Sequence, residues 1–112
     1  MTSNALVVLV TAANLEEASR IADALVGGRL AACVNILGGI ESVYRWEGKV
    51  ARDSEVLMII KTTDDHYAEL EAQVRALHSY TTPEVIALRI EHGSEAYLKW
   101  LGDSVAPSLQ NS

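Results

Sequence analysis

The most specific chemistry in this sequence is a thiol that can meet an ammonium group. Cys33 and Lys61 lie on two apolar, strand-like segments of the chain. A turn near Gly48 and a one-residue bulge at Gly38-Gly39 would bring these segments together, with Cys33 opposite either Lys61 or Thr62. A neighbouring ammonium favours the thiolate, which attacks electrophiles and binds soft metal ions. A free cysteine in a strand is often only a small buried apolar side chain, so both interpretations stay open.

A second candidate is the segment from His78 to Glu84, between a predicted helix and a predicted strand. It brings an imidazole, the phenol of Tyr80 and a carboxylate into one short loop, where binding residues often concentrate. Each residue also has a structural interpretation. His78 could complement the negative end of the helix, Tyr80 could pack, and Glu84 could be solvated.

Aromatic side chains mark the end of a predicted hairpin, where Trp46 follows closely on Tyr44. Such a pair could stack a ligand. Aromatic residues on the surface of an oligomer more often anchor a neighbouring subunit, and we favour that interpretation.

Known catalytic motifs do not occur in the sequence, which has no P-loop, HExxH, GxSxG or CxxC pattern. Its three histidines also do not predict a metal site within one chain. His66 and His78 are twelve residues apart on one predicted helix, or roughly 18 Å of rise. His92 lies beyond the far end of the last predicted strand. We therefore expect a binding protein without enzyme activity.

Composition indicates a folded, acidic chain. Its 112 residues fit a single domain over residues 1–112, with 49% hydrophobic and 21% charged residues. The formal net charge of −6 disfavours nucleic acid and anionic membranes as partners. The apolar run at residues 5–10 is too short to span a bilayer, and Cys33 has no second cysteine with which to form a disulfide. We expect a complete, cytoplasmic chain.

Apolar periodicity predicts four strands and three helices in the order of the α+β, ferredoxin-like βαββαβ fold, followed by a terminal helix. Asn14 with Glu17 predicts the start of the first helix and Gly27-Gly28 its end. Thr63 is the expected cap of the second helix, and Ser94 that of the third. The expected strands are residues 5–10, 30–46, 56–61 and 84–91.

Consecutive apolar residues at positions 6–10 and 56–60 would place hydrophobic side chains on both faces of the sheet. Two helices cover only one face. At about 25 cal/mol per Å² of apolar area, leaving the other face in water would forgo several kcal/mol. We expect the chain to associate with copies of itself, or else the third helix to fold back over this face.

Four segments carry a resemblance to a known family: Ala32-Cys33-Val34-Asn35-Ile36, Ser42-Val43-Tyr44-Arg45-Trp46-Glu47-Gly48-Lys49, Glu55 through Ile60-Lys61-Thr62, and His78-Ser79-Tyr80-Thr81-Thr82-Pro83-Glu84. In this order they resemble the CutA family of divalent-cation tolerance proteins, over about residues 6–101. Members are ferredoxin-like homotrimers similar to PII signalling proteins, with long strands wrapping between subunits. The resemblance therefore implies a CutA-like domain that forms a PII-like homotrimer.

The resemblance also implies a site in crevices between subunits. Some copper-binding members use a cysteine and two adjacent histidines, whose positions here are Val10, Leu77 and His78. One ligand of three is retained, and Ser79 replaces the usual proline. The family's shared crevice residues correspond here to Cys33, Trp46, Glu55, Lys61, Tyr80 and Glu84.

We expect a divalent metal ion, copper or zinc, or an unidentified small ligand or protein as the partner. His78 and Cys33 are the candidate metal ligands, and a threefold axis could gather three copies of His78 or of a carboxylate. Three alternatives remain: a small enzyme with Cys33 as nucleophile and a base from another subunit, a PII-like signalling trimer, and a stable scaffold.

Overall fold

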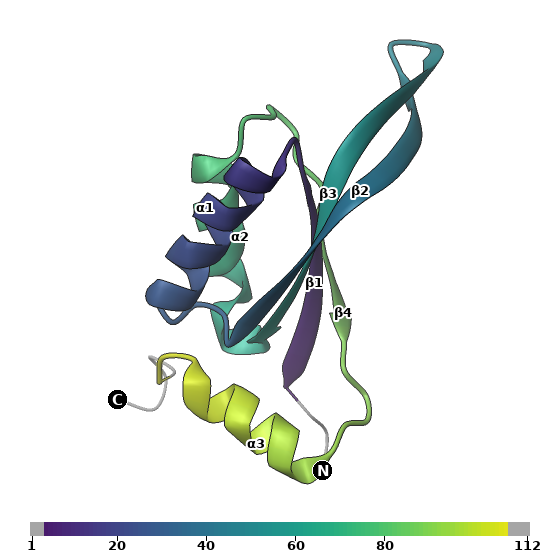
Figure 1. The fold of residues 1–112 in the computed structure, drawn as a ribbon. Helices are drawn as coiled ribbons and strands as arrows, with labels where there is room; N and C mark the ends of the chain where they lie inside the picture. The colour runs from purple at the N-terminus through teal and green to yellow at the C-terminus, as the bar shows by residue number, and fades with distance from the viewer. Residues whose placement is uncertain (1–3, 108–112) are drawn as a thin grey trace.

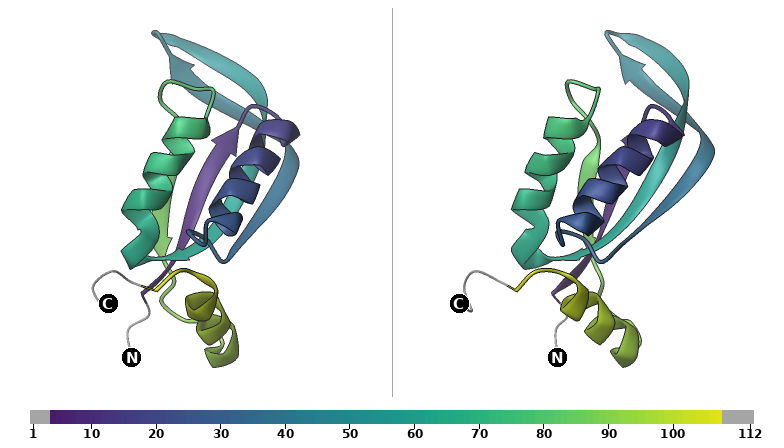
Figure 2. Two further views of the ribbon diagram at one scale, coloured as in Figure 1. Left: turned by 90° about the vertical axis from the view of Figure 1, so that its left-hand side faces the viewer. Right: turned by 60° about the vertical axis from the view of Figure 1, so that its left-hand side comes forward.

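Residues 4–107, which the computed structural model describes, form four strands and three α-helices. The elements are β1 (Ala5–Ala12), α1 (Leu15–Gly27), β2 (Cys33–Trp46), β3 (Lys49–Thr63), a 3₁₀ turn (Asp64–His66), α2 (Tyr67–Leu77), β4 (Val85–Arg89) and α3 (Glu95–Ser104). The strands form one antiparallel sheet in the order β2-β3-β1-β4. Helices α1 and α2 lie on one face of the sheet, and α3 lies at one end (Figures 1 and 2). The predicted α+β, ferredoxin-like fold with its long β2-β3 hairpin is confirmed. No helix within the described residues is long and apolar enough to cross a membrane.

The core lies between the two helices and one face of the sheet. Val8 of β1 and Ile60 of β3 are neighbours across the strands, and both side chains are fully buried. Ile21 and Leu25 of α1 pack with them in one cluster. Burying each such side chain contributes about 1.5–3 kcal/mol. The predicted cap of α1 is also confirmed, because Asn14 Oδ1 accepts a hydrogen bond from the backbone N–H of Glu17 at 2.8 Å.

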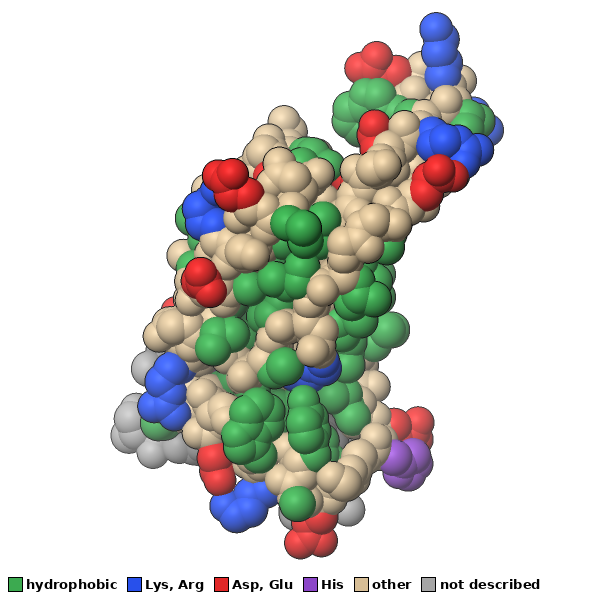
Figure 3. All heavy atoms as spheres, viewed as in Figure 1, with side chains coloured by type: hydrophobic (Ala, Val, Ile, Leu, Met, Phe, Trp, Pro, Cys, Tyr) green, Lys and Arg blue, Asp and Glu red, His purple; other side chains and the backbone are tan. Residues whose placement is uncertain are grey.

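The other face of the sheet stays largely uncovered. Side chains alternate between the faces along a strand, and Leu37, Ile86 and Leu88 belong to the face away from α1 and α2. They are 44%, 50% and 58% exposed. Figure 3, which views the molecule from the edge of the sheet, shows hydrophobic side chains gathered between α3 and the base of the hairpin. We call the sheet face away from α1 and α2 the open face.

Helix α3 covers only one end of the sheet, so it does not fold back over the whole open face. It packs against β1 and β3, and its Leu101 is fully buried. The guanidinium of Arg29 donates hydrogen bonds to the carbonyl oxygens of Asp103, Ser104 and Val105 at the carboxyl end of the helix. These bonds satisfy carbonyls that have no partner within the helix.

The β2-β3 hairpin is much longer than the rest of the sheet, and its tip projects beyond the other strands (Figure 1). The predicted register is confirmed, because Cys33 pairs with Lys61. The predicted bulge is confirmed as well, by a register shift between Leu37 and Ile40. Pairing along the hairpin extends β3 back to Lys49, well before the predicted start at residue 56.

Two further predictions about local structure were wrong. Strand β4 ends at Arg89 and not at residue 91, because β1 is its neighbour and begins at Ala5, near the end of β4. Thr63 does not cap α2. Its hydroxyl pairs with Nδ1 of His66 at 2.8 Å, and a 3₁₀ turn precedes the helix. His66 and His78 therefore flank α2 instead of lying on it.

The tip of the hairpin offers a test of the backbone geometry. Glu47 and Gly48 form the turn with φ values of 49° and 78°, a left-handed conformation that penalises Glu47 but suits asparagine. We expect Glu47→Asn to stabilise the protein by about 0.5–1 kcal/mol in urea unfolding. Glu47→Ala removes the same charge but lacks the short amide side chain that hydrogen-bonds the local backbone in this conformation, so it should give no gain. Equal midpoints for the two variants would contradict this account.

Candidate functional site

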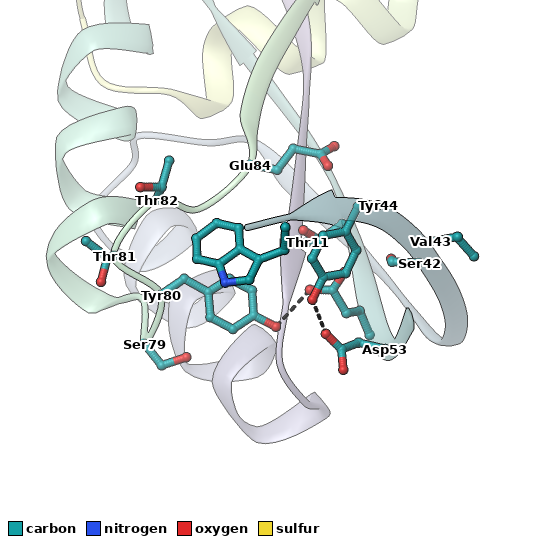
Figure 4. Close-up of a pocket in the computed structure, with 12 residues that line it drawn as sticks. Thr11, Ser42, Val43, Tyr44, Asp53, Ser79, Tyr80, Thr81, Thr82 and Glu84 are labelled. Carbon is teal, nitrogen blue, oxygen red and sulfur yellow. Dashed lines mark hydrogen bonds between the residues drawn. The ribbon is translucent and has the colours of Figure 1, made fainter. Parts of the chain in front are cut away.

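A cavity of about 660 Å³ lies where the hairpin faces the loop between α2 and β4. Four of the predicted crevice residues, Trp46, Glu55, Tyr80 and Glu84, line it. The remaining lining residues are Thr11, Ser42, Val43, Tyr44, Asp53, Ser79, Thr81 and Thr82 (Figure 4).

Strand alternation places the aromatic and acidic side chains of the hairpin on one side. Tyr44 and Trp46 are two residues apart on β2, and Asp53 and Glu55 are two residues apart on β3. Residues at this spacing point to the same face of a strand. Glu55 also shares this side with Leu57 of the open face, so the cavity is continuous with that face.

The hydroxyls of two tyrosines, one on the loop before β4 and one on the hairpin, form hydrogen bonds with the carboxylates of the cavity. Tyr80, from the loop, donates a hydrogen bond to Glu55 Oε2 at 2.8 Å, and Tyr44 donates one to Asp53. In Figure 4 the two tyrosines approach from different elements, with their hydroxyl groups directed towards the carboxylates. Asp53 was not among the predicted site residues, although its two-residue spacing from Glu55 places both carboxylates on one side of a strand.

The two carboxylates raise the pKa values of both phenols. Burial raises the pKa of Tyr80 most, followed by its hydrogen bond to Glu55 and then by the charges of nearby acids that include Asp53. The hydrogen bond to Asp53 raises the pKa of Tyr44 most, and burial and the charges of Asp53 and Glu55 add to this. Ionising either phenol would place a second negative charge beside a carboxylate.

A buried polar network fixes the loop that carries Tyr80. His78 Nε2 donates a hydrogen bond to the carbonyl oxygen of Thr11 at 2.7 Å, and its Nδ1 lies 3.0 Å from Glu17 Oε1. The hydroxyl of Ser79 donates to Glu17 Oε2 at 2.7 Å. Glu17 thus ties α1 to the loop, a role that the predicted capping-box pairing did not anticipate.

His78 is a structural residue in this conformation. Both of its ring nitrogens contact groups of the same chain, and its ring packs against Tyr80 with 4.6 Å between the centroids. It is buried and does not line the cavity. A metal ion could bind His78 only by displacing one of these contacts, so its role as a ligand stays a prediction.

Cys33 and Lys61 lie at the other end of the sheet, away from the cavity. The Lys61 ammonium donates a hydrogen bond to Asn35 Oδ1, and Cys33 Sγ lies 3.9 Å from the same oxygen. On α3, burial and then the charge of Cys33 raise the pKa of Tyr97. The predicted crevice residues therefore form two separate groups in a single chain.

Strand register nevertheless places both groups on the open face. Cys33 and Lys61 are paired, and Lys61 lies at even spacing from Ile59, Leu57 and Glu55 along β3. A surface that covered the open face would therefore contact both groups. Within residues 4–107, no three His, Cys, Asp or Glu side chains are arranged to hold a metal ion. The carboxylates of the cavity suit a hard cation better than copper, which prefers thiolate and imidazole.

Comparison with known proteins identifies the family. The family model described as "CutA1 divalent ion tolerance protein" matches residues 6–104. The chain belongs to this family. A divalent-cation tolerance protein CutA of Thermus thermophilus is 50% identical over 98 residues, which are 88% of this chain and 95% of that protein. The predicted resemblance to CutA proteins is confirmed.

Two plant CutA proteins are also similar. Protein CutA, chloroplastic, of Arabidopsis thaliana is 54% identical over 99 residues, 88% of this chain, which spans only 54% of the length of that relative. The crystal structure of CutA1 from Oryza sativa has a TM-score of 0.92 and 50% identity, and covers 96% of this chain and 98% of that one.

Val10, Leu77 and His78 are the positions at which the sequence resemblance implies copper ligands, and the first two are apolar core positions in this chain. Val10 is fully buried on the helix-facing side of β1. Leu77 packs against the same core at the end of α2. The structure thus leaves only His78 with a ligating atom at these positions, and that residue is engaged in the buried network.

Titration of Tyr80 tests the cavity electrostatics. Its raised pKa means that this group contributes stability below the ordinary tyrosine pKa of 10.0, and that this stability is lost as pH rises towards the folded value. In Glu55→Gln, tyrosinate absorbance should show Tyr80 ionising at lower pH, though still above 10.0 because burial remains. Tyr80→Phe assigns the signal, and Glu91→Gln serves as the control for charge. An unchanged titration in Glu55→Gln would show that the pair does not form.

Proposed function

We propose that this CutA-family chain assembles as a homotrimer and binds a divalent metal ion or a small ligand in crevices between its subunits, as part of the response to metal ions. The observation that carries the proposal is the position of the acidic cavity, which opens at the margin of the exposed apolar face. A partner subunit that covered this face would also close the cavity.

Self-association is supported by the energetics of the open face. Leu37 comes from β2, and Ile86 and Leu88 come from β4 at the opposite edge of the sheet. Each of the three exposes about half of its surface. Burial at about 25 cal/mol per Å² favours a partner surface over water, and an exposed apolar surface of this kind marks an interaction site. A second copy of the chain supplies a partner of matching chemistry.

Metal binding also depends on the assembly in this proposal. A single chain offers carboxylates of Asp53, Glu55 and Glu84 at the cavity, but no ready three-ligand group among its described residues. Ligands from more than one subunit would complete the coordination. Oxygen donors favour zinc or harder ions, whereas a copper site would need Cys33 or His78.

A binding role fits the structure better than an enzymatic one. An enzyme that used Cys33 as nucleophile would need a base from another subunit, because His78 lies at the opposite end of the sheet. A PII-like signalling trimer would use the same crevices, with ligand binding as its input. We propose the cytoplasm as its compartment, on the basis of its single free cysteine.

A single charged substitution on the open face tests the oligomeric state. Sedimentation of dilute wild-type protein should give the mass of a trimer. Leu88→Lys should shift it to monomer, because three buried ammonium groups would lose their solvation. Val26→Lys makes the same type of change on the exposed side of α1 and should leave the trimer intact. A wild-type monomer would refute the proposed assembly.

Calorimetric titration with zinc and copper separates two sets of ligands. If carboxylates bind the ion, Glu55→Gln and Glu84→Gln should each weaken binding by about tenfold or more. His78→Gln and Cys33→Ser should then bind like the wild type. The reverse pattern would support the copper-type set. If neither the wild type nor any variant binds zinc or copper, metal binding is refuted and only the small-ligand form of the proposal remains.

A further inference from the structure

The cavity combines aromatic rings with carboxylates, and we propose that its ligand is a small organic ammonium cation, carrying a protonated or quaternary amine. This inference rests on the proposed ligand-binding role of the cavity and specifies the chemical class of the ligand. Three observations support it: the charge of the lining, the exposure of its aromatic rings, and its size.

The charge of the lining selects for cations. Asp53, Glu55 and Glu84 all contribute to it, and the part of the chain that the structure describes places no lysine, arginine or histidine there. The hydroxyls of Tyr44 and Tyr80 each occupy one acceptor position of a carboxylate. An ionised carboxylate has further acceptor positions, which an ammonium N–H can use.

The aromatic side chains are exposed where a cation would lie. Trp46, Tyr44 and Tyr80 are 60%, 40% and 36% exposed, and all three line the cavity. The face of an aromatic ring attracts an organic cation, and indole attracts it most strongly. Aromatic walls with acidic groups between them therefore match an amine that carries both a positive charge and apolar alkyl groups. A bare metal ion has the charge but no alkyl groups.

The size of the cavity favours a molecule over an ion. Its 660 Å³ falls within the range of roughly 300–1,000 Å³ that is typical of small-molecule sites. The loop that supplies Tyr80 is held by the buried contacts of Glu17 with Ser79 and His78, so this wall is formed before a ligand arrives. A preformed wall reduces the entropy lost on binding.

Tetramethylammonium is a suitable probe. Its control is neopentyl alcohol, a neutral compound whose neopentane framework has the shape of tetramethylammonium. In the Trp100→Phe background, Trp46 is the remaining tryptophan and reports on the cavity by fluorescence. We expect a saturable change with tetramethylammonium in the millimolar range and a much weaker one with neopentyl alcohol. Equal binding of the two compounds, or no saturable binding of the cation, would overturn the proposal.

Variants measured by calorimetry locate the probe. Glu55→Gln should weaken tetramethylammonium binding by about fivefold, and Glu69→Gln, the same change on the surface of α2, should not affect it. Trp46→Leu should weaken binding by about fivefold, whereas Trp46→Phe, which keeps a ring face, should retain most of it. Native mass confirms that each variant keeps the wild-type assembly, and wild-type affinity in both Glu55→Gln and Trp46→Leu would overturn the assignment.

Metal titrations on the same samples separate this inference from the proposed function. Zinc binding without tetramethylammonium binding would refute the ammonium site and leave the proposed metal-binding function intact. Tetramethylammonium binding without zinc or copper binding would support the ammonium site and remove the metal from the proposed function. Competition between zinc and tetramethylammonium would support a shared cationic site in the cavity.

Discussion

The unequal covering of the sheet is the constraint on which the rest of this structure depends. Side chains alternate between its two faces, and α1 and α2 bury only one of them. The buried face holds the core, including Val8 and Ile60. The open face carries further apolar side chains, which a single chain leaves in water. One chain therefore buries only part of its apolar surface.

The long hairpin supplies one wall of the candidate site, at the margin of the uncovered face. Beyond the bulge, β2 and β3 continue past the neighbouring strands, and their alternation directs Tyr44, Trp46, Asp53 and Glu55 to one side. The loop before β4 supplies the opposing wall. That loop is positioned by the buried carboxylate of Glu17, which reaches it from α1. The site thus has two walls: the projecting hairpin, which is partly exposed, and the loop before β4, which buried contacts hold in place. Both lie at the margin of the surface that an assembly would cover.

Much of the fold could be predicted because its signals are local. Asn14 identified the start of α1, and the apolar pattern identified every strand. Counting residues around a turn and a bulge placed Cys33 opposite Lys61 or Thr62, and the structure pairs it with Lys61. Predictions failed where a contact with another residue or strand determined the local structure. Strand β4 ends where β1 no longer pairs with it. The hydroxyl of Thr63 forms a hydrogen bond with the ring of His66 and not with a backbone amide of the helix.

The sequence by itself determined the order of the elements, the register of the hairpin, the acidic charge and, through its motifs, the family. Only the tertiary structure decided which chemical groups meet. It placed Trp46, Glu55, Tyr80 and Glu84 around one cavity, added Asp53 to them, and separated all of these from Cys33 and Lys61. It also enclosed His78 among Thr11, Glu17 and Tyr80. The physical reason is that periodicity and turn geometry act between residues close in sequence, whereas a cavity depends on the twist of strands and on contacts between distant segments.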